Sequence, residues 1–372
     1  MPESAAAPAK ASTVSLRKVA AWRGIRALTW DGGILYGCRG YRIFRLHAER
    51  GAAWEPFASF RPAWWRNLTS RNSLTSRLMR DGFHSLAMVH AAGGDHTAIG
   101  AVPGAIVTRT PGGGQFHITH RIRRGTRPLH ITAVPGGNIY WGEYFDNRER
   151  AEVHIFASAD GGETWQAAYT FPAGTIRHIH NIVYDRWEDC LWILTGDEGP
   201  ECKVLRATCD LQSVEVVLAG NQQARAVAAI PMRDALYLST DTPFEGNHIL
   251  RLTRDGRVKE LADMASSSIF GCCAGEAVFF STMVEPSEAN RAREVHIVGS
   301  ADRSDWQVLA RWQKDRWPMR YFQYGNVSLP DGENRTHYLA ATTVAVERDD
   351  LVTTMWEVEC LPDAPMERPL SA

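Results

Sequence analysis

The chain repeats one unit of short apolar strands along most of its length, and this repeat restricts the fold more than any other feature. Each unit starts with an apolar strand, a polar or glycine-rich turn and a second strand, as in RALTWDGGILYGCRG (26–40) and HITAVPGGNIYWGEY (130–144). The units begin about 44 to 58 residues apart, close to the length of a four-stranded propeller blade. Their first residues are Arg26, His84, His130, His180, Arg225, Ile269 and Asn326.

The ends of the chain complete this pattern. The first six units carry a third and a fourth strand, whereas the seventh has three, at 326–330, 337–346 and 351–359. An N-terminal strand at 14–22 can supply the missing fourth strand, which would close the ring and remove an open sheet edge. We therefore predict an all-β propeller of seven four-stranded blades, with six as the alternative because the seventh unit is the least regular. The predicted domain spans 13–360, between a flexible N-terminal tail (1–12) and a C-terminal tail (361–372).

The stretch FASADGGETWQAAYTF (156–171) predicts a hairpin that caps its own turn. Two short strands flank Asp160-Gly161-Gly162, a turn signal in which glycine supplies positive φ and aspartate bonds to the backbone that follows. Ser158 can bond the turn in the same way, and the ring of Trp165 can cover it. The alternative is an ordinary hairpin, which does not need this combination of residues.

Ser158-Ala-Asp160-Gly-Gly162-Glu-Thr-Trp165 resembles the Asp-box, or BNR repeat, of the sialidase-like β-propellers. SADRSDW (300–306) is a degenerate copy, and RATCDLQSVEV (206–216) is a weaker one. The resemblance implies a structural turn between the third and fourth strands of a blade, on the face opposite the ligand site. Sialidases, xyloglucanases, sortilin-like receptors and photosystem assembly factors share this motif, so it implies a fold and no single activity. The Arg-Ile-Pro sequence that opens sialidases is absent, and a sialidase would have six blades.

Composition excludes several classes of function. The net charge of −1 argues against a nucleic-acid partner. We find no apolar run near 18 residues and no signal peptide, so we expect no membrane insertion. The seven cysteines are odd in number and several lie in apolar strands, which favours a cytoplasmic location over a disulfide framework.

The repeat alignment places polar residues around one mouth of the ring. Six of the seven inner strands begin with a polar residue, where a buried strand would begin with an apolar one. A water-filled channel would explain this pattern, and so would a pocket for a polar ligand at the mouth. We predict ligand contacts from Arg26, His84, His130, His180, Arg225, Arg320, Gln323 and Tyr324.

Arginine and carboxylate residues suggest the chemistry of that ligand. A guanidinium group offers two donors to the two oxygens of a carboxylate, so the arginines indicate an acidic ligand. Glu143, Asp197 and Asp241 end the second strands of three adjacent units and are the predicted catalytic residues. Glycoside hydrolysis needs two carboxyl groups about 5 to 9 Å apart, which adjacent blades can supply. The alternative is that each of them caps a turn.

We expect no metal and no other cofactor. Three histidines from consecutive units, His84, His130 and His180, could bind one ion, as propeller histidines do in a seven-bladed oligogalacturonate lyase that this arrangement resembles. Three blades span a wide arc, which argues against this alternative. His178 and His180 should point to opposite faces of a regular strand, so that only His180 lines the channel.

The resulting hypothesis is a carbohydrate-active protein of the sialidase-like superfamily. It would be a glycoside hydrolase or a polysaccharide lyase whose partner is an acidic oligosaccharide or polysaccharide. Because no complete catalytic motif of that superfamily is present, the alternative is a non-catalytic propeller that binds a glycan or a protein partner.

Overall fold

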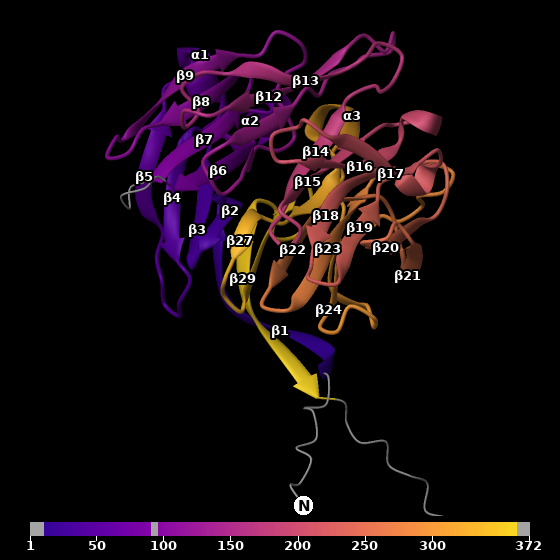
Figure 1. The fold of residues 1–372 in the computed structure, drawn as a ribbon. Coiled ribbons are helices and arrows are strands. Elements are labelled where there is room, and N and C mark those ends of the chain that lie inside the picture. The colour runs from indigo at the N-terminus through magenta and orange to yellow at the C-terminus, as the bar shows by residue number, and fades with distance from the viewer. Residues whose placement is uncertain (1–10, 91–95, 363–372) are drawn as a thin grey trace, which may run out of the picture.

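A computed structural model describes residues 11–90 and 96–362, and nearly all of its regular structure is antiparallel β-sheet (Figure 1). Three short α-helices and two 3-10 helices lie in the connections: α1 (Trp64–Thr69), α2 (Ser73–Met79), α3 (Met319–Phe322), η1 (Gly199–Glu201) and η2 (Gln222–Ala224). The two tails predicted at 1–12 and 361–372 lie mostly outside the described residues. Where they are described, strands β1 and β29 extend two residues into them.

The strands pair in successive groups of four, each an antiparallel meander in chain order. The first three groups are β2 (Arg26–Gly32), β3 (Ile34–Arg39), β4 (Arg42–His47) and β5 (Glu55–Phe60); β6 (Ser85–His90), β7 (His96–Val102), β8 (Ala105–Arg109) and β9 (Gln115–Arg121); and β10 (Thr132–Ala133), β11 (Ile139–Gly142), β12 (Val153–Ser158) and β13 (Gln166–Phe171).

The next three groups follow the same order. They are β14 (Ile179–Asp185), β15 (Cys190–Thr195), β16 (Lys203–Thr208) and β17 (Val214–Ala219); β18 (Ala226–Pro231), β19 (Ala235–Thr240), β20 (Asn247–Thr253) and β21 (Val258–Met264); and β22 (Ser268–Ala274), β23 (Ala277–Val284), β24 (Glu294–Ser300) and β25 (Gln307–Gln313).

The two ends of the chain share the last group. Strands β26 (Gly325–Ser328), β28 (Tyr338–Val344) and β29 (Val352–Pro362) come from the C-terminal end, and β1 (Ala11–Arg23) pairs with β29 from Ala11 to Arg23. Figure 1 shows β1 and β29 side by side, where the first and last colours of the chain meet. This is the shared closing group that the sequence predicts.

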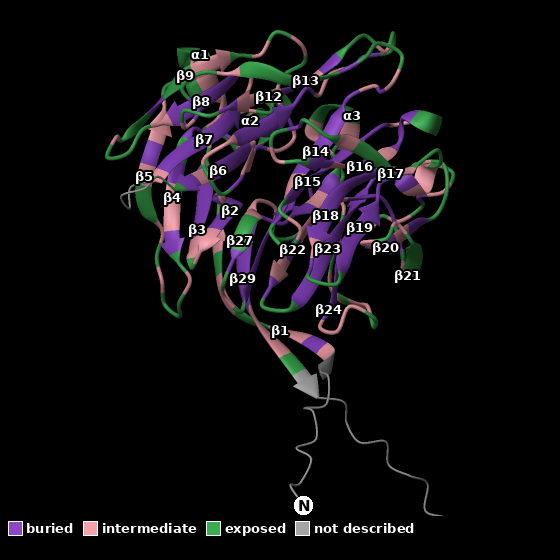
Figure 2. Cartoon of the chain, viewed as in Figure 1, coloured by how far each residue is buried: buried purple, intermediate pink, exposed green. Residues whose placement is uncertain are grey.

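Apolar side chains fill the space between every two consecutive groups. One core cluster joins the first and second groups, and another joins the last group back to the first through Ala27, Leu35, Ala340 and Met355. Figure 2 shows the inner strands buried and the outer strands and turns exposed. The β-propeller class is confirmed. The number of blades stays a prediction, which these pairings and clusters support.

A short strand inside the ring is absent from the sequence prediction. β27 (Asp331–Asn334) was expected to be part of a turn, but it pairs in parallel with β2, the innermost strand of the first group. It also reaches the fourth group, where Glu333 pairs with Arg186 at 2.6 Å, and the sixth, where the Asn334 amide donates to the Cys273 carbonyl. The central space of the ring therefore contains a strand.

The hairpin at 158–165 has the self-capped form that its residues predict. Asp160 accepts hydrogen bonds from the amides of Glu163 (3.1 Å) and Thr164 (2.9 Å), and the Ser158 hydroxyl accepts one from the Gly162 amide. Gly162 has φ +90°, and a Cβ there would lie 2.8 Å from a side-chain atom of Ile99 in the neighbouring group. The turn is thus fitted against the adjacent group of strands.

Candidate functional site

A group of polar side chains, here called the mouth cluster, gathers at one end of the third to sixth strand groups. Its members lie at the starts of inner strands or just after second strands, which is the end of each meander opposite the 158–165 hairpin. They are linked to one another by ion pairs, ring contacts and electrostatic interactions. The cluster comprises Tyr144, Arg177, His178, His180, Asp197, Arg225, Asp241 and Glu285.

His178 and His180 point to the same spot, contrary to the expectation of opposite faces. Their Nε2 atoms lie 3.1 Å apart. The register of β14 against β15 shifts between Ile179 and Asn181, so the strand is not regular at His180. A shift of this kind re-aims a side chain, which explains why alternation failed here. Both rings are buried, with 4% and 3% of their surface exposed.

Asp197 lies over the two histidines. Gly196 precedes it with φ +119°, and a Cβ there would lie 2.4 Å from the backbone of Cys202, so only glycine allows this tight turn. One carboxylate oxygen of Asp197, Oδ1, lies 3.4 Å from His178 Nε2 and 3.3 Å from His180 Nε2. The other, Oδ2, lies 3.1 Å from Arg177 Nη1.

Arg225 joins the two predicted catalytic aspartates. Its Nη2 atom lies 3.4 Å from Asp197 Oδ1 and 3.4 Å from Asp241 Oδ2. Asp241 is 6% exposed, and its second oxygen, Oδ1, has no hydrogen-bond partner within the described residues. The Nε atoms of Arg225 and Arg177 are likewise buried without a partner there. The cluster therefore holds unused donors and an unused acceptor in a largely buried place.

The same surroundings push the pKa values of the two aspartates in opposite directions. Burial raises the pKa of Asp241 to about 7, an effect that Arg225 opposes and that Glu285 and Asp197 reinforce. Burial also acts to raise the pKa of Asp197, but hydrogen bonds from His178 and His180 outweigh it and hold that pKa well below its usual range. Burial raises the pKa of Tyr144 to about 12. One carboxyl group therefore keeps its proton near neutral pH while its neighbour is ionised.

A second pocket on this end of the ring, here called the arginine pocket, contains three of the predicted ligand residues. Its volume is about 360 Å³, and Arg26, His84 and Gln323 line it together with Arg80 and Arg127. Within the described part of the chain, none of these three arginines lies within ion-pair distance of a carboxylate. Burial, then the nearby charges of Arg26 and Arg80, lowers the pKa of Arg127 to about 10. The pocket is therefore positively charged and suits an anion.

Glu143 and His130 are directed elsewhere. The Glu143 carboxylate pairs with both Arg124 Nε (2.9 Å) and Nη2, and accepts from the His154 amide. It lines a separate cavity of about 600 Å³ beside β9 and β12. His130 pairs through Nδ1 with Asp331 of β27 at 2.9 Å. The structure therefore does not bring Glu143 together with Asp197 and Asp241, because a local arginine already neutralises it.

Two further predicted ligand residues are exposed. Arg320 belongs to α3 and Tyr324, 40% exposed, follows it. The helix α3 packs against α2, and together α1, α2 and α3 present an exposed apolar surface, here called the helical patch. It comprises Trp64, Trp65, Leu68, Leu74, Leu78, Met79 and Tyr321.

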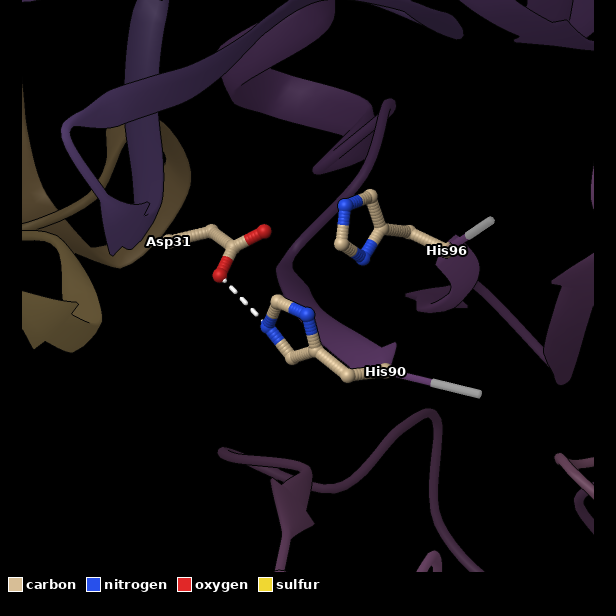
Figure 3. Close-up of side chains that lie close together, drawn as sticks. All are labelled: Asp31, His90 and His96. Atoms are coloured by element: carbon tan, nitrogen blue, oxygen red, sulfur yellow. Dashed lines mark hydrogen bonds and ion pairs between the residues drawn. The ribbon is translucent and has the colours of Figure 1, made fainter. Parts of the chain in front are cut away.

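Two clusters with metal-ligand chemistry occur among the described residues outside the mouth cluster. Figure 3 shows Asp31, His90 and His96, where His90 Nε2 lies 2.7 Å from Asp31 Oδ1 and the two imidazole rings meet edge to face. These residues lie at the turns between first and second strands, at the end opposite the mouth cluster. His248, Glu260 and Asp263 form the other. His84, His130 and His180 do not form such a cluster, because His130 pairs with β27 and His180 with His178.

Sequence reasoning predicted His180, Asp197, Arg225 and Asp241 as site residues of the mouth cluster. It missed Glu285, and it also missed Asp331, which lies outside the cluster. Glu285 follows a second strand, as Asp197 and Asp241 do, and that position in the repeat could have revealed it. Asp331 begins β27, the strand inside the ring. It was missed because the sequence Pro-Asp-Gly at this point is typical of a turn.

No protein-family description and no curated protein matches the sequence. Solved structures do match over most of the chain. The WD40 propeller domain of Doa1 has a TM-score of 0.53 at 8% identity and covers 92% of this chain and 97% of its own. YCF48 bound to D1 peptide has a TM-score of 0.51 at 12% identity, with 92% and 96% covered.

Two enzymes are also among the similar structures. Puromycin hydrolase has a TM-score of 0.55 at 13% identity, with 87% of this chain and 50% of that chain covered. An ancestral GH74 enzyme has a TM-score of 0.51 at 11% identity, with 92% and 47% covered, so this chain spans about half the length of either enzyme. In the described residues no helix is long and apolar enough to cross a membrane. The chain is thus similar in fold to a WD40 propeller domain, to YCF48, to puromycin hydrolase and to an ancestral GH74 enzyme, and at these identities the similarity shows the fold alone.

Proposed function

We propose that the protein is an enzyme that cleaves an acidic oligosaccharide, as a glycoside hydrolase or a polysaccharide lyase, with the mouth cluster as its reaction centre. The observation that carries this proposal is the pair of aspartates on Arg225. Asp241 holds a proton near pH 7 while Asp197 is ionised. Carboxyl groups whose surroundings separate their pKa values are the usual means of dividing acid and base roles.

The roles follow from these states. The protonated Asp241 would act as the general acid toward a leaving oxygen, because its buried Oδ1 has no partner. Asp197 is held by two histidines and two arginines. Its role would therefore be to provide negative charge and to orient its neighbours, and it would not act as a nucleophile. Glu143, paired with Arg124, is left without a direct part in this reaction.

The arginine pocket supports an acidic ligand. Arg26, Arg80 and Arg127 have no carboxylate partner among the described residues, although one nitrogen of Arg26 and one of Arg127 already donate to backbone carbonyls. Each charge-assisted bond from their remaining donors to a ligand carboxylate would contribute about 1.5 to 3 kcal/mol. Resemblance of the 158–165 hairpin to the Asp-box and the similarity in fold to an ancestral GH74 enzyme are consistent with a carbohydrate substrate.

The test is a screen of uronic-acid, sialic-acid and neutral oligosaccharides by calorimetry and by product release. We expect binding and turnover with one acidic class. Asp241→Asn should abolish product release while leaving the dissociation constant within a few-fold, and Arg127→Gln should weaken binding at least tenfold. Glu288→Gln, which changes an exposed carboxylate on the loop that follows Glu285 and has no ion pair among the described residues, is the control. Equal, feeble responses to all three sugar classes would refute the proposal.

A second candidate function is non-catalytic binding of a protein partner. The helical patch favours it, because Trp64 is 79% exposed and Leu68 is 60% exposed on α1, a short helix that contacts α2. Exposed apolar patches of this kind mark interaction surfaces. YCF48, similar in fold, is described in complex with a peptide. In this case Trp64→Ser would reduce capture of the partner, and Asp241→Asn would change no reaction.

A further inference from the structure

We propose that His178, His180 and Asp197 bind one divalent transition-metal ion, with Zn²⁺ as the best match. The proposal rests on the arrangement of three ligand atoms and does not depend on the substrate. It revises the sequence-based expectation of no metal, which considered only histidines spread over three blades.

The distances among the three ligand atoms are those of a tetrahedral site. His178 Nε2 and His180 Nε2 are 3.1 Å apart, and Asp197 Oδ1 lies 3.4 Å and 3.3 Å from them. A tetrahedral ion with bonds of about 2.0 Å separates its ligand atoms by about 3.3 Å. The three atoms therefore form one face of such a coordination shell, and three protein ligands leave the fourth position for water or substrate.

The outer hydrogen bonds fix both rings in the form that binds metal. His178 Nδ1 lies 3.1 Å from the Phe145 carbonyl oxygen, and His180 Nδ1 lies 3.0 Å from that of Ala226. A carbonyl can only accept, so each Nδ1 carries a hydrogen and Nε2 is the ring atom that can bind a metal. Backbone carbonyls orient metal-binding histidines in this way. Two Nε2 atoms and a carboxylate oxygen converge on one point, where a metal ion would take the place of the proton that otherwise links them.

The neighbouring arginines do not prevent this. Arg177 pairs with Asp146 at 2.7 Å, and Arg225 Nη2 lies 3.4 Å from Asp241 Oδ2, so each guanidinium group has an oxygen acceptor besides Asp197. Imidazole and carboxylate ligands suit Zn²⁺ and its first-row neighbours, and the set contains no thiolate.

The Asp31, His90 and His96 cluster is the weaker candidate and supplies a control. His90 is 61% exposed, and among the described residues no backbone carbonyl orients its ring nitrogens; its hydrogen bond is to Asp31. An exposed pair of this kind is explained by the His90–Asp31 hydrogen bond alone.

Elemental analysis of the full-length protein, first treated with a chelator and then dialysed with ZnCl₂, tests the proposal. We expect about one bound zinc per chain in the wild type and in His90→Gln, and a loss of at least tenfold in zinc affinity in His180→Gln and Asp197→Asn. Replacing zinc by Co²⁺ should give the visible absorption of a four-coordinate ion. Thermal melting without metal shows whether each variant folds.

Two results would overturn the proposal: less than a tenth of an equivalent of Zn²⁺, Co²⁺, Mn²⁺ or Ni²⁺ on the wild type, or loss of zinc in His90→Gln with retention in His180→Gln. If the variants fail to fold, a wild-type melting temperature that Zn²⁺ does not raise would overturn it as well. Since no assay uses a sugar, failure here is separate from failure of the proposed enzymatic function.

Discussion

Replacing Asp160 tests whether the 158–165 hairpin is structural. The carboxylate accepts four hydrogen bonds, from the Ser158 hydroxyl (2.8 Å), the amides of Glu163 and Thr164 (3.1 and 2.9 Å) and the Thr164 hydroxyl (2.6 Å). These bonds, first among them that of the Thr164 hydroxyl, lower the pKa of Asp160 to about 2. Each bond contributes about 1 kcal/mol, and water replaces part of this at an exposed turn, so Asp160→Ala should cost about 2 kcal/mol.

Calorimetric melting and urea unfolding measure this loss. In a domain of this size, 2 kcal/mol lowers the melting temperature by about 3 °C. Asp160→Asn keeps one carbonyl acceptor and should lose less, and Glu163→Gln, an exposed change in the same turn, should lose almost nothing. Ligand binding at a fixed temperature should survive all three changes. Unchanged stability combined with lost binding in Asp160→Ala would show that the hairpin lies at the functional end of the ring.

Three further changes test the packing and the mouth cluster. Gly162→Ala should destabilise the fold by about 2 to 3 kcal/mol in urea unfolding, because φ is +90° and the new Cβ meets a neighbouring isoleucine at 2.8 Å; no change would place the turn away from that group. Glu201→Ala should cost about 2 kcal/mol, since it leaves the partly buried Arg150, paired at 2.7 and 2.8 Å, without its carboxylate; a smaller loss than in the exposed Glu55→Ala would contradict this. Asp241 has a pKa raised to about 7 in the folded state and about 4 when unfolded, so the native state holds this proton more tightly between those values. Its contribution to the free energy of unfolding therefore falls as pH rises from 4 to 7, and Asp241→Asn should remove that fall; parallel pH profiles of the two proteins would refute the assignment.

The fold was predictable because its signals are local and repeated. Alternating apolar strands and glycine-rich turns recur along the chain, and each copy supports the assignment of the others. Counting strands also showed that both chain ends share the last group, because the seventh unit has three strands and one strand precedes the first unit. β27 could not be found in this way. Its four residues begin with Asp331-Gly332 and have the composition of a turn, and they form a strand because they pair with the edge of β2.

The candidate site was predictable in position but not in its pairings. The repeat placed Asp197, Arg225 and Asp241 at one end of the ring, and the structure brings these three together. Glu143 occupies the equivalent position in its own group, yet Arg124 neutralises it and turns it toward another cavity. The sequence carries no signal that distinguishes a carboxylate with a local arginine from one without, since that arginine comes from a neighbouring loop.

The sequence by itself determined the propeller class, the self-capped hairpin and the end of the ring where polar residues collect, because these depend on patterns within one unit. Only the tertiary structure decided which side chains face one another. A one-residue register shift in β14 turned His178 toward His180, and backbone carbonyls of the two neighbouring groups set which nitrogen of each ring faces Asp197. Burial beside residues of the neighbouring strand groups, which no single unit contains, gave Asp241 its raised pKa. Contacts between units depend on the packing of the whole ring, and that packing is what a single stretch of sequence does not specify.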